Sequence, residues 1–265
     1  MPLRIAGPDE ARGLVFGDLS EFFTPFLDRF VRDAVRGRGE VWVSKRNDVT
    51  DGLLLFNALE KVGSIFTHDP TVAETLYRLK EGVALFSEFP LGAKPEMYHV
   101  LAADPAGESE PHRFAHIVRM ARPAERPAIA RILDEMYGPL DTSWLQATSG
   151  DGDRCFLVEV AGEIAGVGGV SVVGPYGRLH SLSVRPHFRR MRIGTDLWHA
   201  RMLWARRAGV RRVLSEISEH NAASLAIARA GGMQRVGRMF LSHRPAPASG
   251  DGGPAVRTDL VRHVD

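Results

Sequence analysis

A segment with the residue types of an anion-binding site runs LHSLSVRPHFRRMRIGTDLW over residues 179–198. It contains an extended apolar run, a proline, an arginine-rich loop and the start of an amphipathic helix. The unbonded N–H groups in the first turn of a helix and the positive end of its dipole attract anions. This order of residues therefore predicts a binding site for a phosphate or pyrophosphate group.

The positive charge of the chain is concentrated around this segment. Residues 1–113 hold 13 Lys+Arg and 18 Asp+Glu, whereas the rest of the chain holds 21 and 14. Residues 178–212 contain ten arginines, with Asp196 as their one acid. This imbalance indicates an anionic ligand. A phosphate-bearing cofactor is favoured over a nucleic acid, because several of these arginines alternate with apolar residues and would not form one basic stripe.

The segment resembles the phosphate loop of the GCN5-related N-acetyltransferase (GNAT) family, Q/R-x-x-G-x-G/A following a strand and V-x-P. Val184, Pro186, Arg189 and Gly194 match this pattern, and Arg192 stands where the family has its first glycine. The resemblance implies acetyl-CoA as a co-substrate. Its pyrophosphate is then expected on the loop residues Arg189, Arg190, Met191, Arg192, Ile193, Gly194 and Thr195.

A second motif, SEISEHNAASLAIARAGGM at residues 215–233, resembles the next strand and helix of the family. Asn221 stands where the family's asparagine contacts the pantetheine arm, and it is equally suited to be a helix N-cap. The resemblance also implies that the strand bearing Leu182, Ser183 and Val184 separates from its neighbour. The backbone amides of these three residues are then expected to bind pantetheine and polarise the thioester carbonyl.

Glu216 is the candidate general base, because it precedes Asn221 as a catalytic glutamate does in acetyltransferases that modify the N-terminal alanine of a ribosomal protein. The alternative is a structural ion pair between Glu216 and one of the arginines. His180, in the preceding strand, is a second candidate base or a structural residue. An α-amino group, with a pKa of about 8, is far easier to deprotonate than a lysine at about 10.4, so a modest base suffices for it.

The usual tyrosine acid of the family is missing, since Ala228 occupies its position. A thiolate with a pKa of about 8.5 can leave without full protonation, so this change weakens catalysis without excluding it. Tyr137 and Tyr176 are better explained as packed or surface residues. Cys155 is the one cysteine, and it is interpreted as a core residue rather than a metal ligand or a disulfide partner.

The rest of the sequence predicts an α+β protein, with a mixed, mostly antiparallel sheet flanked by helices. ADPAGESEPH at 103–112 is rich in proline, glycine and charge, which indicates a boundary between domains 1–112 and 113–265. Helices are predicted at 20–36, 71–80, 123–137, 142–147, 193–208 and 221–230. Strands are predicted at 3–6, 41–45, 53–59, 62–66, 83–89, 97–102, 114–120, 155–160, 164–173, 179–184, 210–218, 239–244 and 255–264.

Both halves share the order strand, helix, hairpin, strand, helix, strand, which suggests a duplication. The first half has no phosphate loop, because THDPTVAETLYRL at 67–79 lacks glycine and arginine and carries Asp69 and Glu74 where phosphates would lie. Domain 1–112 is therefore interpreted as a degenerate acetyltransferase-like domain. An unrelated α+β domain is the alternative.

The expected function is transfer of an acetyl group from acetyl-CoA to a primary amine, which is a protein N-terminus or a small amine. A catalytically weak, acyl-CoA-binding regulatory protein is the alternative, because of Arg192 and Ala228. No run is apolar and long enough for a membrane span, and the N-terminus lacks a signal pattern, so a cytoplasmic protein without a membrane partner is expected. The sequence leaves open whether the protein forms an oligomer.

Overall fold

The computed structural model describes residues 3–5, 39–47, 49–57, 61–107, 112–137 and 152–246. These residues divide into two compact units, one that ends at His99 and resumes at Gly237, and one from Val100 to Val236. Strands β6 (Glu96–Ala103) and β12 (Gln234–Arg244) pass from one unit into the other. The predicted helices 20–36 and 142–147 and the predicted strand 255–264 lie outside the described residues.

The first unit contains strands in the order β1-β2-β3-β4-β5-β12. β2, β3 and β4 pair antiparallel, and β5 returns parallel to β4 after helix α3. β12 pairs antiparallel with β5, although the predicted division at residue 112 assigns this strand to the second domain. The elements are β1 (Leu3–Ile5), β2 (Gly39–Arg46), β3 (Val49–Asn57), β4 (Val62–Phe66), α3 (Pro70–Tyr77) and β5 (Val83–Ser87).

The first hairpin has a shorter turn than the sequence predicts. The polar run NDVTDG at 47–52 indicates a loop, but β3 already begins at Val49 and includes Gly52. A side chain at Gly52 would collide with the Val72 side chain of α3, so this glycine permits close packing rather than a turn. Val72 belongs to the core of the unit, with other α3 residues against β3, β4 and β5.

The second unit contains strands in the order β6-β11-β10-β9-β8-β7. β8, β9 and β10 pair antiparallel, and β11 returns parallel to β10 after helix α5. The pairing β2-β3-β4-α3-β5 of the first unit is thus repeated here. The elements are β7 (Val118–Met120), η2 (Pro123–Glu125), α4 (Arg126–Tyr137), β8 (Asp153–Val160), β9 (Glu163–Val173), β10 (Tyr176–Val184), η4 (Pro186–Phe188), α5 (Ile193–Arg207), β11 (Arg212–Ser218) and α6 (Ala222–Ala230).

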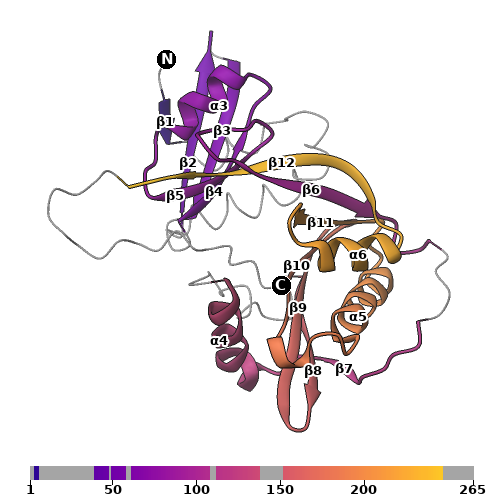
Figure 1. The fold of residues 1–265 in the computed structure, drawn as a ribbon. Helices are drawn as coiled ribbons and strands as arrows, with labels where there is room; N and C mark the ends of the chain where they lie inside the picture. Colours follow the sequence, from indigo (N-terminus) through magenta and orange to yellow (C-terminus); the bar gives the residue numbers. More distant parts are fainter. Residues whose placement is uncertain are drawn as a thin grey trace, which may run out of the picture. The chain divides into compact units, whose positions relative to one another are not determined.

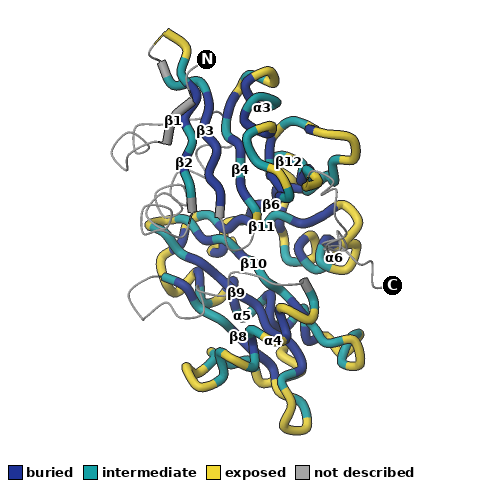
Figure 2. The backbone as a smooth tube through the Cα atoms, turned by 90° about the vertical axis from the view of Figure 1, so that its left-hand side faces the viewer, coloured by how far each residue is buried: buried dark blue, intermediate teal, exposed yellow. Residues whose placement is uncertain are grey.

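Helices α4 and α5 cover opposite faces of the sheet in the second unit (Figure 1). Ile129 and Leu133 of α4 pack on Val167, whereas Leu197 of α5 packs with Leu179 in a separate apolar cluster. The middle of β9, between the two helices, is therefore buried, as its dark tube shows in Figure 2, whereas β10 is a mixture of buried and intermediate residues. The predicted α+β architecture with flanking helices is confirmed.

Strand β7 begins later than predicted, at Val118 rather than at residue 114. The amides of Ala115 and His116 donate to the carboxylate of Asp196 instead of to a neighbouring strand. A buried side chain in α5 thus competes successfully for these backbone groups, which periodicity does not reveal.

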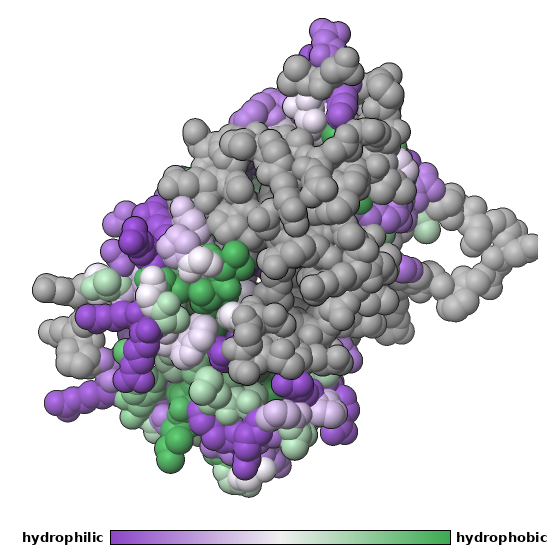
Figure 3. Space-filling model, turned by 180° about the vertical axis from the view of Figure 1, so that it is seen from behind, coloured by the Kyte–Doolittle hydropathy of each residue, from purple (hydrophilic) through white to green (hydrophobic). Residues whose placement is uncertain are grey.

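The surface of the described residues is mixed in character. Figure 3 shows small apolar areas between hydrophilic side chains on one face. No helix among the described residues is long and apolar enough to cross a membrane. The exposed large hydrophobic side chains are Phe114, Ile117, Met120, Met191, Leu203 and Val236.

Candidate functional site

Strands β10 and β11 separate after a short paired stretch. Their parallel pairing extends only from Tyr176 to Arg178 on β10. Immediately beyond it the Ser215 hydroxyl donates to the Leu179 carbonyl at 3.1 Å, where a ladder hydrogen bond would otherwise form. The rest of β10, up to Val184, continues without a registered partner on β11. The predicted cofactor residues 182–184 lie on this stretch, which pairs with β9 on its other side.

The end of β10 directs backbone polar groups into the resulting gap. Arg185 N–H donates to the Ala165 carbonyl of β9 at 2.9 Å. Because the N–H groups of successive strand residues point to opposite sides, the Val184 amide points away from β9. On that side Arg189 Nε donates to the Val184 carbonyl at 3.3 Å. An amide at such an edge is suited to hydrogen-bond an extended ligand or a carbonyl oxygen.

A β-bulge interrupts β10 between His180 and Ser183, with Ser181 in the left-handed region at φ 52°. Arg201 of α5, only 1% exposed, donates from Nη1 to the His180 carbonyl at 3.3 Å and to the Gly169 carbonyl at 3.1 Å. A buried guanidinium from the helix thus satisfies carbonyls beside the bulge. The bulge also changes which face of the sheet each later side chain of β10 occupies.

The loop before α5 leaves the helix N-terminus open. Arg190 and Arg192 both have positive φ, 63° and 64°, and Arg192 is the N-cap without a side-chain capping bond. The first intrahelical bond runs from Asp196 N–H to the Arg192 carbonyl at 2.9 Å. The N–H groups of Ile193, Gly194 and Thr195 precede this bond, so the loop provides three amides beside basic side chains.

Two loop residues have packing roles besides. Ile193 is only 1% exposed, so its side chain anchors the helix in the core and only its amide faces the loop. A Cβ at Gly194 would lie 3.1 Å from Ile227 Cδ1 of α6, so the glycine allows α5 and α6 to approach closely. Arg192 adopts a left-handed backbone conformation, which costs roughly 1–2 kcal/mol for a residue with a Cβ.

A buried cluster of one aspartate and two histidines lies at the first turn of α5. Asp196 is fully buried and accepts hydrogen bonds from His112 Nε2 at 2.7 Å, His116 Nδ1 at 2.9 Å and the His116 amide at 3.0 Å. Burial opposes ionisation of Asp196, but these hydrogen bonds outweigh it and lower the pKa of the carboxyl. The one acid in the basic segment is therefore turned inward and held by histidines.

A stacked histidine pair completes this cluster. The His112 ring stacks on His199 of α5, with centroids 3.8 Å apart. Burial, and then the neighbouring His112, lower the pKa of His199 to about 4. His199 is therefore neutral near pH 7, and the positive charge at the start of α5 comes from arginines.

Asn221 is the N-cap of α6, where its Oδ1 accepts from the Ser224 amide at 3.1 Å. Its side chain is exposed, so its NH₂ group remains directed to solvent or a ligand. At the other end of α6, Gly232 has φ 86° and Met233 N–H donates to the Ala228 carbonyl at 2.9 Å. This pair of residues ends the helix in a Schellman motif and buries Met233.

Glu216 lies on β11 beyond the point where the two strands part. Arg178 Nε donates to both of its carboxylate oxygens, at 3.1 Å and 3.0 Å, and the Glu216 side chain is 8% exposed. The structural alternative that the sequence left open, an ion pair, is therefore present. A catalytic role for Glu216 remains a proposal.

The other candidate residues have structural partners. His180 contacts the Ser171 hydroxyl at 3.0 Å through Nε2 and the Ser181 hydroxyl at 3.1 Å through Nδ1. Ala228 is buried in the core, and Tyr176 lies at the end of β10 opposite to the loop. Burial raises the pKa of Cys155 to about 12, which makes it an unreactive thiol.

Arg178 and Arg201 are the residues that sequence reasoning missed. The sequence shows ten arginines in residues 178–212, but no pattern separates an arginine in a core from one on a surface. The pair Gly168-Gly169 in β9 was the available signal, because glycines in a strand often mark a close approach. A Cβ at Gly168 would lie 3.0 Å from Arg201 Nε, and one at Gly169 would collide with the His180 ring.

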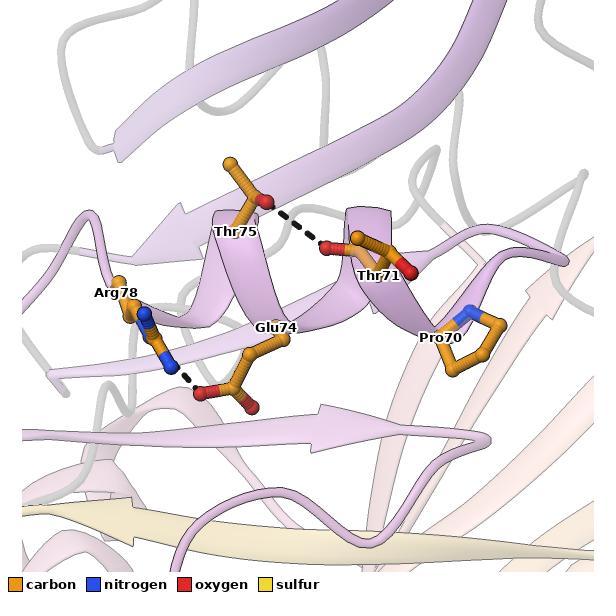
Figure 4. A pocket seen from close by; sticks show the side chains of 5 residues that line it. All are labelled: Pro70, Thr71, Glu74, Thr75 and Arg78. Carbon is orange, nitrogen blue, oxygen red and sulfur yellow. Dashed lines mark hydrogen bonds and ion pairs between the residues drawn. The ribbon is translucent and has the colours of Figure 1, made fainter.

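A surface depression is found elsewhere, on the outer face of α3 in the first unit (Figure 4). Its lining includes an ion pair between Glu74 and Arg78 at 2.9 Å, and Thr75 Oγ1 donates to the Thr71 carbonyl at 2.8 Å. These polar groups already bond to one another, so they do not form a ligand site. Among the described residues no group of histidines, cysteines and acids has an arrangement suited to a metal ion.

Comparison with known proteins points to one family. Residues 115–232 match the family model described as the acetyltransferase (GNAT) family. A search of curated proteins found no significant match. A solved GCN5-related N-acetyltransferase from Sphaerobacter thermophilus has 14% sequence identity and a TM-score of 0.64, covering 93% of this chain and 96% of that chain.

Two further solved structures are similar at the same low identity of 14%. A Drosophila protein has a TM-score of 0.62 over 92% of this chain and 99% of that chain. A tandem GNAT protein from the clavulanic acid biosynthesis pathway has a TM-score of 0.59 over 91% and 98%. These likenesses establish the acyl-CoA N-acyltransferase fold, and the family match itself comes from the acetyltransferase (GNAT) model over residues 115–232.

Proposed function

We propose that the second unit transfers an acetyl group from acetyl-CoA to a primary amine. One observation supports this more than any other: the gap between β10 and β11 runs along the carboxyl-terminal half of β10, and the open N-terminus of α5 follows that strand in the chain. An extended ligand with a pyrophosphate at one end fits this order of groups. The family match supports the reaction class.

In this proposal the pyrophosphate binds the amides of Ile193, Gly194 and Thr195 with Arg189, Arg190 and Arg192 around them. The exposed loop residue Met191 then borders the site. The pantetheine arm binds the backbone of Leu182, Ser183 and Val184 and the free NH₂ of Asn221. Arg192 supplies the left-handed backbone in place of glycine and adds a cation near the phosphates. The positive charge of the segment favours the bound anion.

The chemical step joins the amine nitrogen to the acetyl carbon and breaks the carbon–sulfur bond, so that CoA leaves as a thiolate. The amine must first be neutral, and its proton passes to Glu216 through water. Because Ala228 provides no hydroxyl, the thiolate takes its proton from solvent. This step is slower than one with a positioned acid, by a factor of about 10².

A regulatory protein that binds acyl-CoA without turnover is the second candidate. Two observations favour it, the buried Ala228 at the acid position and the engagement of both Glu216 oxygens by Arg178. Both candidates require the same cofactor site. Only turnover separates them.

The experiment combines acetyl-CoA binding by calorimetry with CoA release in the presence of pooled primary amines. We expect micromolar binding and CoA release, with a loss of about 10²-fold in kcat for Glu216→Gln and unchanged acetyl-CoA affinity. Binding without release across the whole panel would favour the regulatory candidate. Absence of binding would contradict both.

The first unit is proposed to be a degenerate relative of the second. The strand pairing around α3 repeats that around α5, including a parallel pair formed across the helix. A tandem GNAT protein among the similar structures is consistent with such a duplication. Calorimetry with a variant whose second-unit loop cannot bind acetyl-CoA tests whether the first unit is degenerate. Any acetyl-CoA binding that remains would locate a cofactor site in the first unit and contradict the proposal.

A further inference from the structure

The face of the sheet opposite to α5 carries a row of polar side chains along the gap. Alternate residues of β9 lie on one face of the sheet, and each pairs with a residue of β10 on that face. The pairs are Val167 with Ser183, Gly169 with His180, and Ser171 with Arg178. The bulge is what brings Ser183 onto the same face as His180 and Arg178. Val167 packs with α4, so this row lies on the α4 side of the sheet.

Glu216 belongs to the same face, because it lies two residues after Leu214, which pairs with Arg178. The neighbouring residues Val213 and Ile217 point the other way, into the cluster that contains α5. Arg178, His180 and Glu216 thus flank the gap on the side away from α5. An acceptor that reaches a thioester in the gap from this side passes these residues.

Arg178 has unused donors. Its Nε is shared between the two oxygens of Glu216, and no described residue accepts a hydrogen bond from Nη1 or Nη2. The Arg178 side chain is 33% exposed, whereas the Glu216 side chain is only 8% exposed. Glu216 therefore fixes the orientation of the Arg178 guanidinium through Nε. Its terminal nitrogens, Nη1 and Nη2, stay available to a ligand.

Resting on the proposed acetyl transfer, we propose that Arg178 binds a carboxylate of the acceptor, which is then a small amino acid or a related amino carboxylate. Two terminal nitrogens of a fixed guanidinium match the two oxygens of a carboxylate. An oriented fork loses less conformational freedom on binding than a mobile side chain. The basic surroundings also favour an acceptor whose carboxylate offsets the charge of its amine.

The test uses matched acceptors that differ only in the carboxylate: glycine with methylamine, β-alanine with ethylamine, and γ-aminobutyrate with propylamine. CoA release at saturating acetyl-CoA is the readout. We expect kcat/KM to be at least tenfold higher for the amino acid in one or more pairs. Equal rates within every pair, or a preference for peptides whose carboxylate is remote from the amine, would overturn the proposal.

Arg178→Lys is the informative variant, because it keeps a cation beside Glu216 but removes the planar fork. We expect KM for the preferred amino acid to rise at least tenfold, with the KM for acetyl-CoA unchanged. Arg154→Lys is the matched control, since Arg154 lies over the Trp204 ring of α5 and not on the polar row. A rise of the same size in the amino-acid KM of Arg154→Lys would indicate a general structural effect and contradict the specific role of Arg178.

Binding of propionate and butyrate, measured by saturation-transfer NMR with acetyl-CoA present, separates this proposal from the proposed function. If no amine releases CoA but the wild type binds these carboxylates and Arg178→Lys does not, the reaction is wrong and the carboxylate site is supported. If the wild type binds neither acid, or the variant binds them equally well, the carboxylate site is wrong whatever the turnover.

Discussion

The N-termini of α3 and α5 occupy the same place in two strand–helix–strand arrangements with the same parallel pairing, but only the α5 end lacks a side-chain cap. Asp69 caps α3, accepts from the Thr71 amide at 2.8 Å and pairs with Arg46 at 2.8 Å. At α5 the capping position belongs to Arg192, which has no side-chain capping bond, and the one nearby acid is buried among histidines. The α3 end is therefore capped by its own side chain, whereas the α5 end has no side-chain cap, and the proposed pyrophosphate site uses its first-turn amides.

The strands beside the two helices differ in the same direction. In each unit the parallel pairing covers three residue pairs, which start at Val62 on β4 and at Tyr176 on β10. Beyond them β4 ends within two residues, at Phe66, whereas β10 continues to Val184. A shared topology therefore does not make a shared site. The two units differ in the capping residue of the helix and in the length of strand that continues beyond the parallel pairing.

The largest effect is expected from Asp196→Asn, which removes the buried charge that organises the start of α5. The free energy of unfolding should fall by about 3 kcal/mol or more, because asparagine lacks the charge and sets an NH₂ donor, in place of one acceptor oxygen, against His112 or His116 in a buried position. Asp69→Asn at α3 is the counterpart, and it should have little effect, since asparagine also caps helices and the lost ion pair is exposed. Urea unfolding of both variants measures the two losses in free energy of unfolding. Equal losses in the two variants would contradict this prediction.

Arg192→Asp should convert the end of α5 into one like that of α3. The new carboxylate can cap the free amides and repels a phosphate, so acetyl-CoA should bind at least 100-fold more weakly, about 2.7 kcal/mol. Calorimetry measures this change. The thermal midpoint should not fall, because a capped helix is at least as stable, and retained affinity would show that the loop is not the pyrophosphate site.

The two helix ends should respond to acid in different pH ranges. His199 has a pKa of about 4 in the folded protein and about 6.5 when unfolded, so stability is lost as pH falls from 6.5 to 4. This loss amounts to about 1–3 kcal/mol. The hydrogen bond from Arg46 lowers the pKa of Asp69, so the contribution of that group is lost only below its usual value of 3.8.

The His199→Phe variant checks this prediction, because phenylalanine keeps an aromatic ring beside His112 but cannot be protonated. Its unfolding free energy should change less between pH 6.5 and pH 4.5 than that of the wild type. A parallel decline of both proteins over this range would remove His199 as the cause.

The smallest effect is expected from Arg192→Gly, which restores the glycine of the family's loop. Relief of the left-handed backbone and the greater freedom of the unfolded chain nearly offset each other, so stability should change by less than about 1 kcal/mol. The acetyl-CoA affinity should stay within about threefold, since the amides keep their places. A much larger loss of affinity would assign Arg192 a dominant direct contact with the phosphates.

Much of the fold could be predicted from local patterns. β4 is found at the predicted residues 62–66, and α5 ends before Gly209, whose φ of 76° lets it close the helix. The late start of β7 was missed, because Asp196, far along the chain, binds the amides of Ala115 and His116. The pairing of β12 with β5 was also missed, since periodicity shows that a strand exists but not its neighbour.

By itself the sequence determined the phosphate-loop pattern, the departure at Arg192, the asparagine cap of α6 and the absence of a hydroxyl at Ala228, because each depends on residue type at a fixed local spacing. Only the tertiary structure decided which arginines serve which purpose. Arg201 is buried under the bulge, Arg178 is fixed by Glu216, and Arg192 closes the loop in a strained conformation. The reason is physical: an arginine's role depends on its acceptors and its exposure, and both come from segments distant in the chain.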